Sequence, residues 1–219
     1  MVFFIKILFT ARRGVYMSKI RVKRLFHPLI RKIAQKLVTT QITPNFLTVT
    51  SFLTLLVATL CIVYQQFVIG GLLIFLGGFL DGLDGELARI TNKTSEKGAF
   101  LDSMTDRYGD LILLLGFLFY KEINILLDFK FWIILTIIGT FMTSYVRARG
   151  EALRVKKTNV GLMARSERLF TLFIACELSF FNSNILPYTI VILAFLTNLT
   201  ALYRIYLIAK QLARGGNEN

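Results

Sequence analysis

The sequence predicts an all-α membrane protein, with six transmembrane helices and an N-terminal amphipathic juxtamembrane helix. Of the 219 residues, 55% are hydrophobic and 18% are charged, whereas a soluble domain carries about a quarter charged residues. One small globule cannot bury so large an apolar fraction, which excludes an ordinary soluble domain, a disordered chain and a disulfide scaffold. Cys61 and Cys176 lie in apolar runs, so we expect two small core residues rather than metal ligands.

Six apolar stretches are near or above the roughly 20 residues that a helix needs to cross a bilayer. We place them at 43–66, 67–90, 98–122, 129–154, 166–182 and 184–211. Lys and Arg gather before the first stretch, around 89–97 and at 147–168. The positive-inside rule puts these segments in the cytoplasm. We therefore expect a multi-pass protein of the cell membrane with both termini in the cytoplasm.

Three segments organise the chain: a cytoplasmic arm at 1–42, the six-helix domain at 43–211 and a polar tail at 212–219. Residues 18–41 alternate Arg and Lys with apolar side chains, which predicts a helix lying on anionic headgroups; a solvated arm is the alternative. The stretch before Met17 is too short to span a bilayer and does not resemble a signal peptide, so Met17 is an alternative start of translation.

The net charge of +13 is compatible with nucleic acid, anionic lipid or an anionic substrate as partner. Its distribution decides between them, because the first 80 residues contain no Asp or Glu while five Asp fall between Asp81 and Asp110. Charge segregated in this way indicates that the basic and the acidic segments each serve a separate local function, and not a uniformly solvated surface. We expect contact with the lipid bilayer and an anionic substrate, and no nucleic acid.

Four aspartates in the second and third stretches carry the chemistry. Asp81 and Asp84 share one helix face, and Asp102 and Asp106 share a face of the next helix. A short loop joins these antiparallel helices, so we expect them to be neighbours whose carboxylates meet below the cytoplasmic surface. Each charge at a helix centre costs about 2.5–3.5 kcal/mol, so the group must protonate or bind cations. Two Mg²⁺ or Mn²⁺ ions would neutralise the four carboxylate charges and would favour a displacement reaction at phosphorus.

Small and polar residues beside these aspartates fit a substrate site. Gly85 and Gly98 leave room for a group to approach the backbone, and Arg89 could bind a phosphate. Asn45 and Thr48 face one side at the cytoplasmic rim. Helix capping and helix–helix hydrogen bonding explain Asn45 and Thr48 equally well.

Residues 81–106 follow the pattern D-x2-D-G-x2-A-R-x8-G-x3-D-x3-D, which resembles the signature of the CDP-alcohol phosphotransferases at every position. The resemblance implies a six-helix membrane enzyme, usually a homodimer, that transfers a phosphatidyl-type group from a CDP-linked lipid to an alcohol and releases CMP. It implies metal ligands at Asp81, Asp84, Asp102 and Asp106, with Asp106 also accepting the proton of the acceptor hydroxyl. It further implies contacts with the CDP-lipid from Asn45, Thr48, Gly85, Arg89 and Ser95. Asp110 lies outside the signature, and we expect it to support the site or to make an interhelical hydrogen bond.

Arginines in the second half of the chain indicate which kind of acceptor the site would bind. Arg204 lies within a predicted span, where its charge is costly unless it faces a polar cavity. A pocket that includes Arg147, Arg149, Arg168 and Arg204 would suit an anionic acceptor, because guanidinium groups bind phosphate by paired hydrogen bonds. The stretches SYVRARGEA and GLMARSER resemble those of family members that use inositol phosphate, the archaetidylinositol phosphate and phosphatidylinositol phosphate synthases. This implies myo-inositol 1-phosphate as acceptor and CDP-archaeol or CDP-diacylglycerol as donor.

Two alternatives stay open. Glycerol 3-phosphate is also anionic, so a phosphatidylglycerophosphate synthase is the main rival. A cation transporter is the candidate from another class. Carboxylates of transporters tend to lie at the bilayer midplane, however, and here they cluster toward one face.

Overall fold

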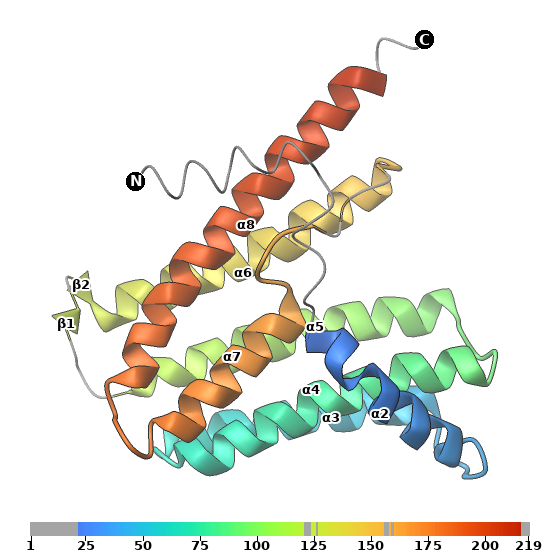
Figure 1. Ribbon diagram of the computed structural model, residues 1–219, viewed down its shortest axis with the longest axis horizontal. Helices are drawn as coiled ribbons and strands as arrows, with labels where there is room; N and C mark the ends of the chain where they lie inside the picture. Colours follow the sequence, from blue (N-terminus) through green and yellow to red (C-terminus); the bar gives the residue numbers. More distant parts are fainter. Residues whose placement is uncertain (1–21, 121–123, 126, 156–157, 159, 216–219) are drawn as a thin grey trace.

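The computed structural model describes residues 22–120, 124–125, 127–155, 158 and 160–215, and these are almost entirely helical. The predicted all-α class is confirmed, and each predicted apolar stretch forms a helix (Figure 1). The elements are α2 (Val22–Leu37), α3 (Pro44–Val63), α4 (Phe67–Ile90), α5 (Glu96–Gly116), the 3₁₀ turn η1 (Phe117–Phe119), the antiparallel strands β1 (Asn124–Ile125) and β2 (Leu127–Asp128), α6 (Phe129–Ala152), α7 (Arg165–Leu178) and α8 (Ile185–Gly215). The expectations for Met17 and for the end of the polar tail lie outside the described residues.

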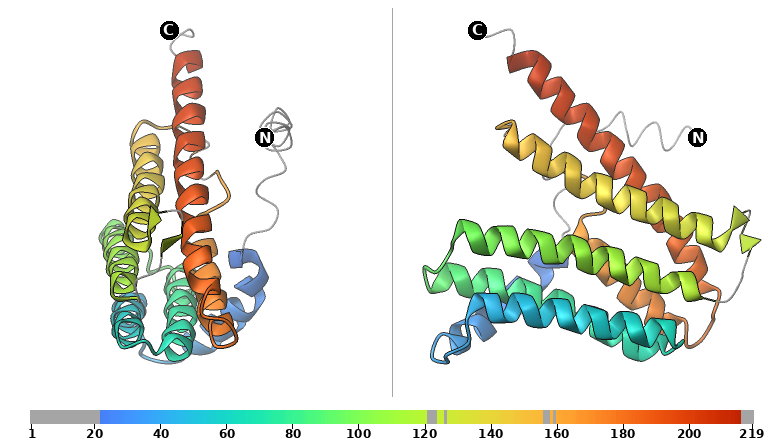
Figure 2. Two further views of the ribbon diagram at one scale, coloured as in Figure 1. Left: turned by 90° about the vertical axis from the view of Figure 1, so that its left-hand side faces the viewer. Right: turned by 180° about the vertical axis from the view of Figure 1, so that it is seen from behind.

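The six helices after α2 form a closed ring. Each packs on two neighbours, in the order α3, α4, α7, α8, α6, α5 and back to α3 (Figure 2). Their inward faces share one hydrophobic core, which includes Leu55, Ile74, Phe117, Ile133, Leu172 and Leu193. Cys176 belongs to this core, as predicted, whereas Cys61 is only partly buried and lies outside it; both are free thiols. Helix α8 continues beyond the other helices toward the C-terminus (Figure 1).

One prediction about this arrangement is wrong, because α4 and α5 do not pack against each other. Helix α3 lies against both of them instead, and close backbone approaches between α4 and α5 are nearly lacking in the described part of the chain. The side chain of Leu55 of α3 lies between the two helices. It contacts both Gly77 of α4 and Gly109 of α5 so closely that a Cβ added to either glycine would lie 3.0 Å from it. Two glycines thus let α3 come close to both helices, and α3 keeps the two acidic helices apart.

Helix starts follow the capping signals of the sequence. The Thr43 hydroxyl accepts a hydrogen bond from the Phe46 amide at 3.2 Å, and Pro44 occupies the first position of α3. Ser95 does the same for α5, accepting from the Gly98 amide at 3.0 Å. The loop between α4 and α5 spans only residues 91–95.

Helix α2 forms within the predicted segment 18–41. Its Ile30 and Ala34 are buried against Leu83 and Leu87 of α4, while its basic and polar side chains are exposed, among them Arg31, Lys32, Gln35 and Lys36. Packing on α4 fixes α2 beside the half of α4 that carries the aspartates (Figure 1).

Four of the described helices are long and apolar enough to cross a membrane: α3, α4, α6 and α8. Helix α5 has 21 residues but carries Asp102, Asp106, Arg107 and Asp110, and α7 has only 14 residues. Length and composition therefore support four of the six predicted spans.

Candidate active site

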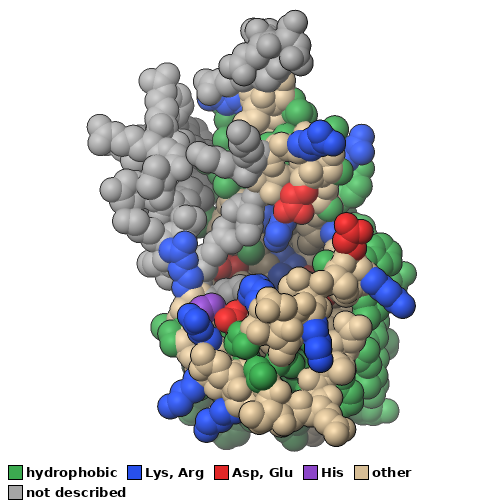
Figure 3. Space-filling model, turned by 90° about the vertical axis from the view of Figure 1, so that its right-hand side faces the viewer, with side chains coloured by type: hydrophobic (Ala, Val, Ile, Leu, Met, Phe, Trp, Pro, Cys, Tyr) green, Lys and Arg blue, Asp and Glu red, His purple; other side chains and the backbone are tan. Residues whose placement is uncertain are grey.

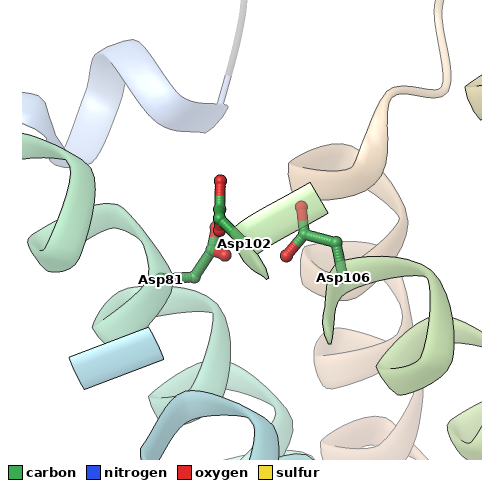
Figure 4. A group of neighbouring side chains, drawn as sticks. All are labelled: Asp81, Asp102 and Asp106. Carbon is green, nitrogen blue, oxygen red and sulfur yellow. The ribbon is translucent and has the colours of Figure 1, made fainter. Parts of the chain in front are cut away.

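Three of the four predicted metal ligands converge between α4 and α5. Asp81 on α4 and Asp102 and Asp106 on α5 each offer a carboxylate oxygen, and these oxygens all lie within 4.8 Å of one another. Figure 4 shows the three side chains pointing toward the same space. Asp81 thus meets Asp102 and Asp106 although the backbones of α4 and α5 do not pack closely on each other. A set of oxygen donors alone suits hard divalent cations such as Mg²⁺ and Mn²⁺.

Asp84 is near this group but outside it. Its side chain is buried, with 5% of the residue exposed, and its Oδ2 accepts a hydrogen bond of 2.6 Å from the Thr48 hydroxyl of α3. Thr48 thus contacts the acidic group through Asp84. The bond also anchors α3 to α4 at the level of the carboxylates.

Arg165 is the residue that the sequence analysis missed. It is the first residue of α7, and its Nη1 lies 2.7 Å from Asp81 Oδ1 and 2.8 Å from Asp106 Oδ1. One nitrogen therefore bridges two of the converging carboxylates, on a side chain that is only 16% exposed. The sequence did hold a signal, because Arg165 and Arg168 are three residues apart and share one face of α7.

Asp110 makes the interhelical hydrogen bond that we expected. It accepts from Nη2 of Arg168, and both side chains are almost fully buried. Arg168 Nη1 also donates to the Met163 carbonyl at 3.4 Å, and Arg165 Nε lies 3.4 Å from Asp110 Oδ1. Two arginines of α7 thus face the aspartates of α4 and α5. They offset two of the five negative charges that ionised Asp81, Asp84, Asp102, Asp106 and Asp110 would carry.

The residues expected to contact a CDP-lipid lie on α3, on the second half of α4 and at the N-cap of α5. Arg89 donates to Glu86 Oε2 from Nη2 at 2.7 Å and from Nε at 3.2 Å. A Cβ on Gly85 would meet nothing closer than the Arg89 guanidinium, at 3.9 Å, so the helix surface is open there. A Cβ on Gly98 would lie 3.1 Å from the Ser95 hydroxyl and 3.5 Å from Asn45 Oδ1. Asn45, Ser95 and Gly98 are therefore neighbours.

The arginines expected to bind an acceptor phosphate contact separate groups. Arg147 is half-exposed and its Nε lies 2.8 Å from Glu151 Oε1. Arg204 is 2% exposed and donates to the Val160 carbonyl at 2.6 Å and to the Thr143 carbonyl at 2.7 Å. It thereby ties α8 to α6 and to the segment before α7. Arg149 is exposed near the end of α6.

Basic side chains surround the end of the molecule where α4 ends and α5 begins. Figure 3 looks onto this end and shows more Lys and Arg than Asp and Glu side chains at the surface. Arg89, Lys93 and Lys97 are among the exposed residues there. The cluster of Asp81, Asp102 and Asp106 thus lies in the half of α4 and α5 that is nearer to this basic end.

Comparison with known proteins decides the family. Residues 41–203 match the model of the CDP-alcohol phosphatidyltransferases. The chain belongs to this family. It is 38% identical over 199 residues to the archaetidylinositol phosphate synthase of Pyrococcus horikoshii, covering 91% of this chain and 100% of that protein. It is 31% identical over 211 residues to the bifunctional IPC transferase and DIPP synthase of Aquifex aeolicus, covering 90% of this chain and 47% of that protein.

Solved structures of Mycobacterium tuberculosis phosphatidylinositol phosphate synthase share the fold. The crystal structure with CDP-DAG bound aligns with a TM-score of 0.71 at 22% identity, over 83% of this chain and 94% of that chain. The complex with manganese and citrate aligns with a TM-score of 0.72 at 21% identity, over 82% and 88%. The protein is thus a transferase, and its apolar helices and family make it a multi-pass membrane protein.

Proposed function

We propose that this protein transfers a lipid-phosphate group from CDP-archaeol or CDP-diacylglycerol to a hydroxyl of myo-inositol 1-phosphate and releases CMP. The observation that carries the proposal is the convergence of Asp81, Asp102 and Asp106 within the family's signature. The choice of acceptor is supported by the Pyrococcus horikoshii relative, which is named an archaetidylinositol phosphate synthase.

The proposed membrane arrangement has six spans, with α5 and α7 completing the ring. Asp106 and Asp110 of α5 are paired with arginines of α7, so these charges need not contact lipid. We place the basic end and both termini in the cytoplasm, with α2 on the membrane surface as part of an arm at 1–42. The catalytic domain spans 43–211 and a polar tail follows at 212–219. The working form is a homodimer in the cell membrane.

The proposed metal site uses Asp81, Asp84, Asp102 and Asp106 to hold two Mg²⁺ or Mn²⁺ ions. The donor set is all oxygen, and the two facing arginines offset fewer charges than the aspartates would carry when ionised. The Mycobacterium tuberculosis protein of the same fold was crystallised with manganese. When bound, the ions would stabilise charge on the phosphate oxygens of the donor.

In the proposed reaction the acceptor hydroxyl attacks the donor's lipid-linked phosphorus, and the bond from this phosphorus to CMP breaks. Asp106 accepts the hydroxyl proton. Residues of α3, of α4 and of the N-cap of α5 hold the CDP-lipid: Asn45, Thr48, Gly85, Arg89 and Ser95. The acceptor phosphate is assigned to Arg147, Arg149, Arg168 and Arg204, because guanidinium groups bind phosphate oxygens in pairs.

The test is CMP release by purified protein with CDP-archaeol or CDP-diacylglycerol, inositol 1-phosphate and Mn²⁺. We expect turnover that a metal chelator abolishes. We also expect Asp106→Asn to abolish turnover while Mn²⁺ and the CDP-lipid still bind. Asp128→Asn is the matched control, because Asp128 caps α6 through the Lys130 amide at 2.9 Å and Asn caps helices equally well.

Three outcomes would change the proposal. Turnover with glycerol 3-phosphate alone would make the protein a phosphatidylglycerophosphate synthase. Near-normal turnover by Asp106→Asn would refute its role as base. Metal flux across liposomes without any CMP release would replace the transferase by a cation transporter.

A further inference from the structure

Arg165 is held by the same carboxylates that we assign to the metal. Its Nη1 bridges Asp81 Oδ1 and Asp106 Oδ1 at 2.7 and 2.8 Å, and the three converging oxygens of the group lie within 4.8 Å of one another. A cation coordinated by Asp81 and Asp106 would therefore stand within a few ångströms of a guanidinium. Like charges at such a separation repel strongly where little water screens them.

Asp110 offers Arg165 a second place to bind. The Arg165 Nε is buried and has no hydrogen-bond partner among the described residues. It lies 3.4 Å from Asp110 Oδ1, which is close enough for an ion pair but not directed as a hydrogen bond. A buried donor left in this way costs free energy. A small rotation of the Arg165 side chain away from Asp81 and Asp106 could complete the bond to Asp110.

We infer that Arg165 is a displaceable counter-ion of the metal site. It neutralises Asp81 and Asp106 until a divalent cation binds them, and then moves onto Asp110. The inference rests on the proposed metal site and adds an element of control to it. Because coupling between two ligands of one site is reciprocal, the arginine lowers the apparent affinity for metal, and metal releases the arginine.

The opposite role for Arg165 makes the opposite prediction. A residue that orients metal ligands raises metal affinity, and its removal typically weakens binding by about 10- to 100-fold. A counter-ion competes with the metal, so its removal tightens binding. The sign of the change therefore separates the two roles.

The experiment is a Mn²⁺ titration of the purified full-length protein at pH 8, where protons compete least for the carboxylates. The electron paramagnetic resonance signal of free Mn²⁺ reports binding without any substrate. We expect Arg165→Gln to bind Mn²⁺ about tenfold more tightly than the wild type. Arg154→Gln is the control for lost charge, since Arg154 is exposed in the turn after α6, and its affinity should equal that of the wild type.

A second measurement guards against a poorly folded variant. Arg165→Lys keeps the charge but loses the planar fork, so its affinity should lie between those of the wild type and Arg165→Gln. The rise in apparent Tm on adding Mn²⁺ should be larger for both variants than for the wild type, because binding to the native state stabilises it. Equal or weaker binding by Arg165→Gln would overturn the inference alone. Absence of binding by the wild type would overturn the metal site itself.

Discussion

Replacing Asp110 with Asn tests how much stability the ion pair between α5 and α7 contributes. The side chains of Asp110 and Arg168 are 7% and 4% exposed, so removing one charge leaves the other buried without its partner. Breaking a buried pair in this way costs about 3–5 kcal/mol. The pair between Arg147 and Glu151 is a matched contrast, because it has the same chemistry but is 46% and 50% exposed. An exposed pair four residues apart on a helix contributes about 0.3–0.5 kcal/mol.

Thermal unfolding in one detergent measures both changes. For a chain of this size 1 kcal/mol shifts the Tm by about 2–4 °C, so we expect Asp110→Asn to lower the apparent Tm by about 6 °C or more and Glu151→Gln by less than about 2 °C. The double variant Asp110→Asn/Arg168→Gln should lose less than the sum of its single variants, because they share one interaction. Equal Tm values for Asp110→Asn and Glu151→Gln, or strict additivity, would refute the reasoning.

Three further substitutions test other contacts. Thr48→Val removes the donor to Asp84 at nearly constant volume, and we expect the Mn²⁺ affinity to fall about tenfold in a titration. Glu86→Gln weakens the ion pair that positions Arg89, and Arg89 is assigned to CDP-lipid binding. Steady-state kinetics should therefore show KM for the CDP-lipid rising about tenfold with little change in kcat. Gly139→Ala places a Cβ 2.8 Å from a backbone nitrogen of α8. It should lower the free energy of unfolding by about 1–3 kcal/mol, as measured by denaturation.

Each substitution has a control in the same chain. Thr54→Val removes a hydroxyl that donates to a carbonyl of its own helix, at 2.7 Å, and should leave Mn²⁺ binding unchanged. Glu96→Gln alters an exposed carboxylate at the start of α5 and should leave KM unchanged. Gly78→Ala adds a Cβ whose nearest neighbour is 3.4 Å away and should barely change stability. A variant that behaves like its control would show that the contact it removes is unimportant.

Helix positions were predictable because a few strong signals determine them. Apolar length marks a span, and the Thr43-Pro44 pair is a typical helix start, which α3 uses: the Thr43 hydroxyl caps it. Neighbour relations were not predictable in the same way, because apolar side chains facing lipid and facing another helix are the same in composition. Leu55 illustrates this: nothing in its local sequence shows that it separates α4 from α5.

Arginine roles were the hardest to predict. Positive-inside anchoring, substrate binding and internal ion pairing all place Arg near a cytoplasmic helix end, so the sequence did not single out Arg165 from its neighbours. Arg204 is buried in a different way from the polar cavity that its position in a span predicts. Backbone carbonyls of Val160 and Thr143 accept hydrogen bonds from its guanidinium, and such bonds lower the cost of burying the charge.

The separation of α4 from α5 links the packing to the chemistry. Direct packing of these helices would leave less room beside Asp81 and Asp106 for a cation such as the guanidinium of Arg165, which lies 2.7 and 2.8 Å from them. Because α3 packs on both helices through Gly77 and Gly109, α4 and α5 meet here through their acidic side chains, and oxygens of Asp81, Asp102 and Asp106 lie within 4.8 Å of one another. Helix α7 packs on α4 as well, and its Arg165 bridges Asp81 of α4 and Asp106 of α5. The small residues of the helix contacts therefore set the geometry of the charged site, although none of them is charged.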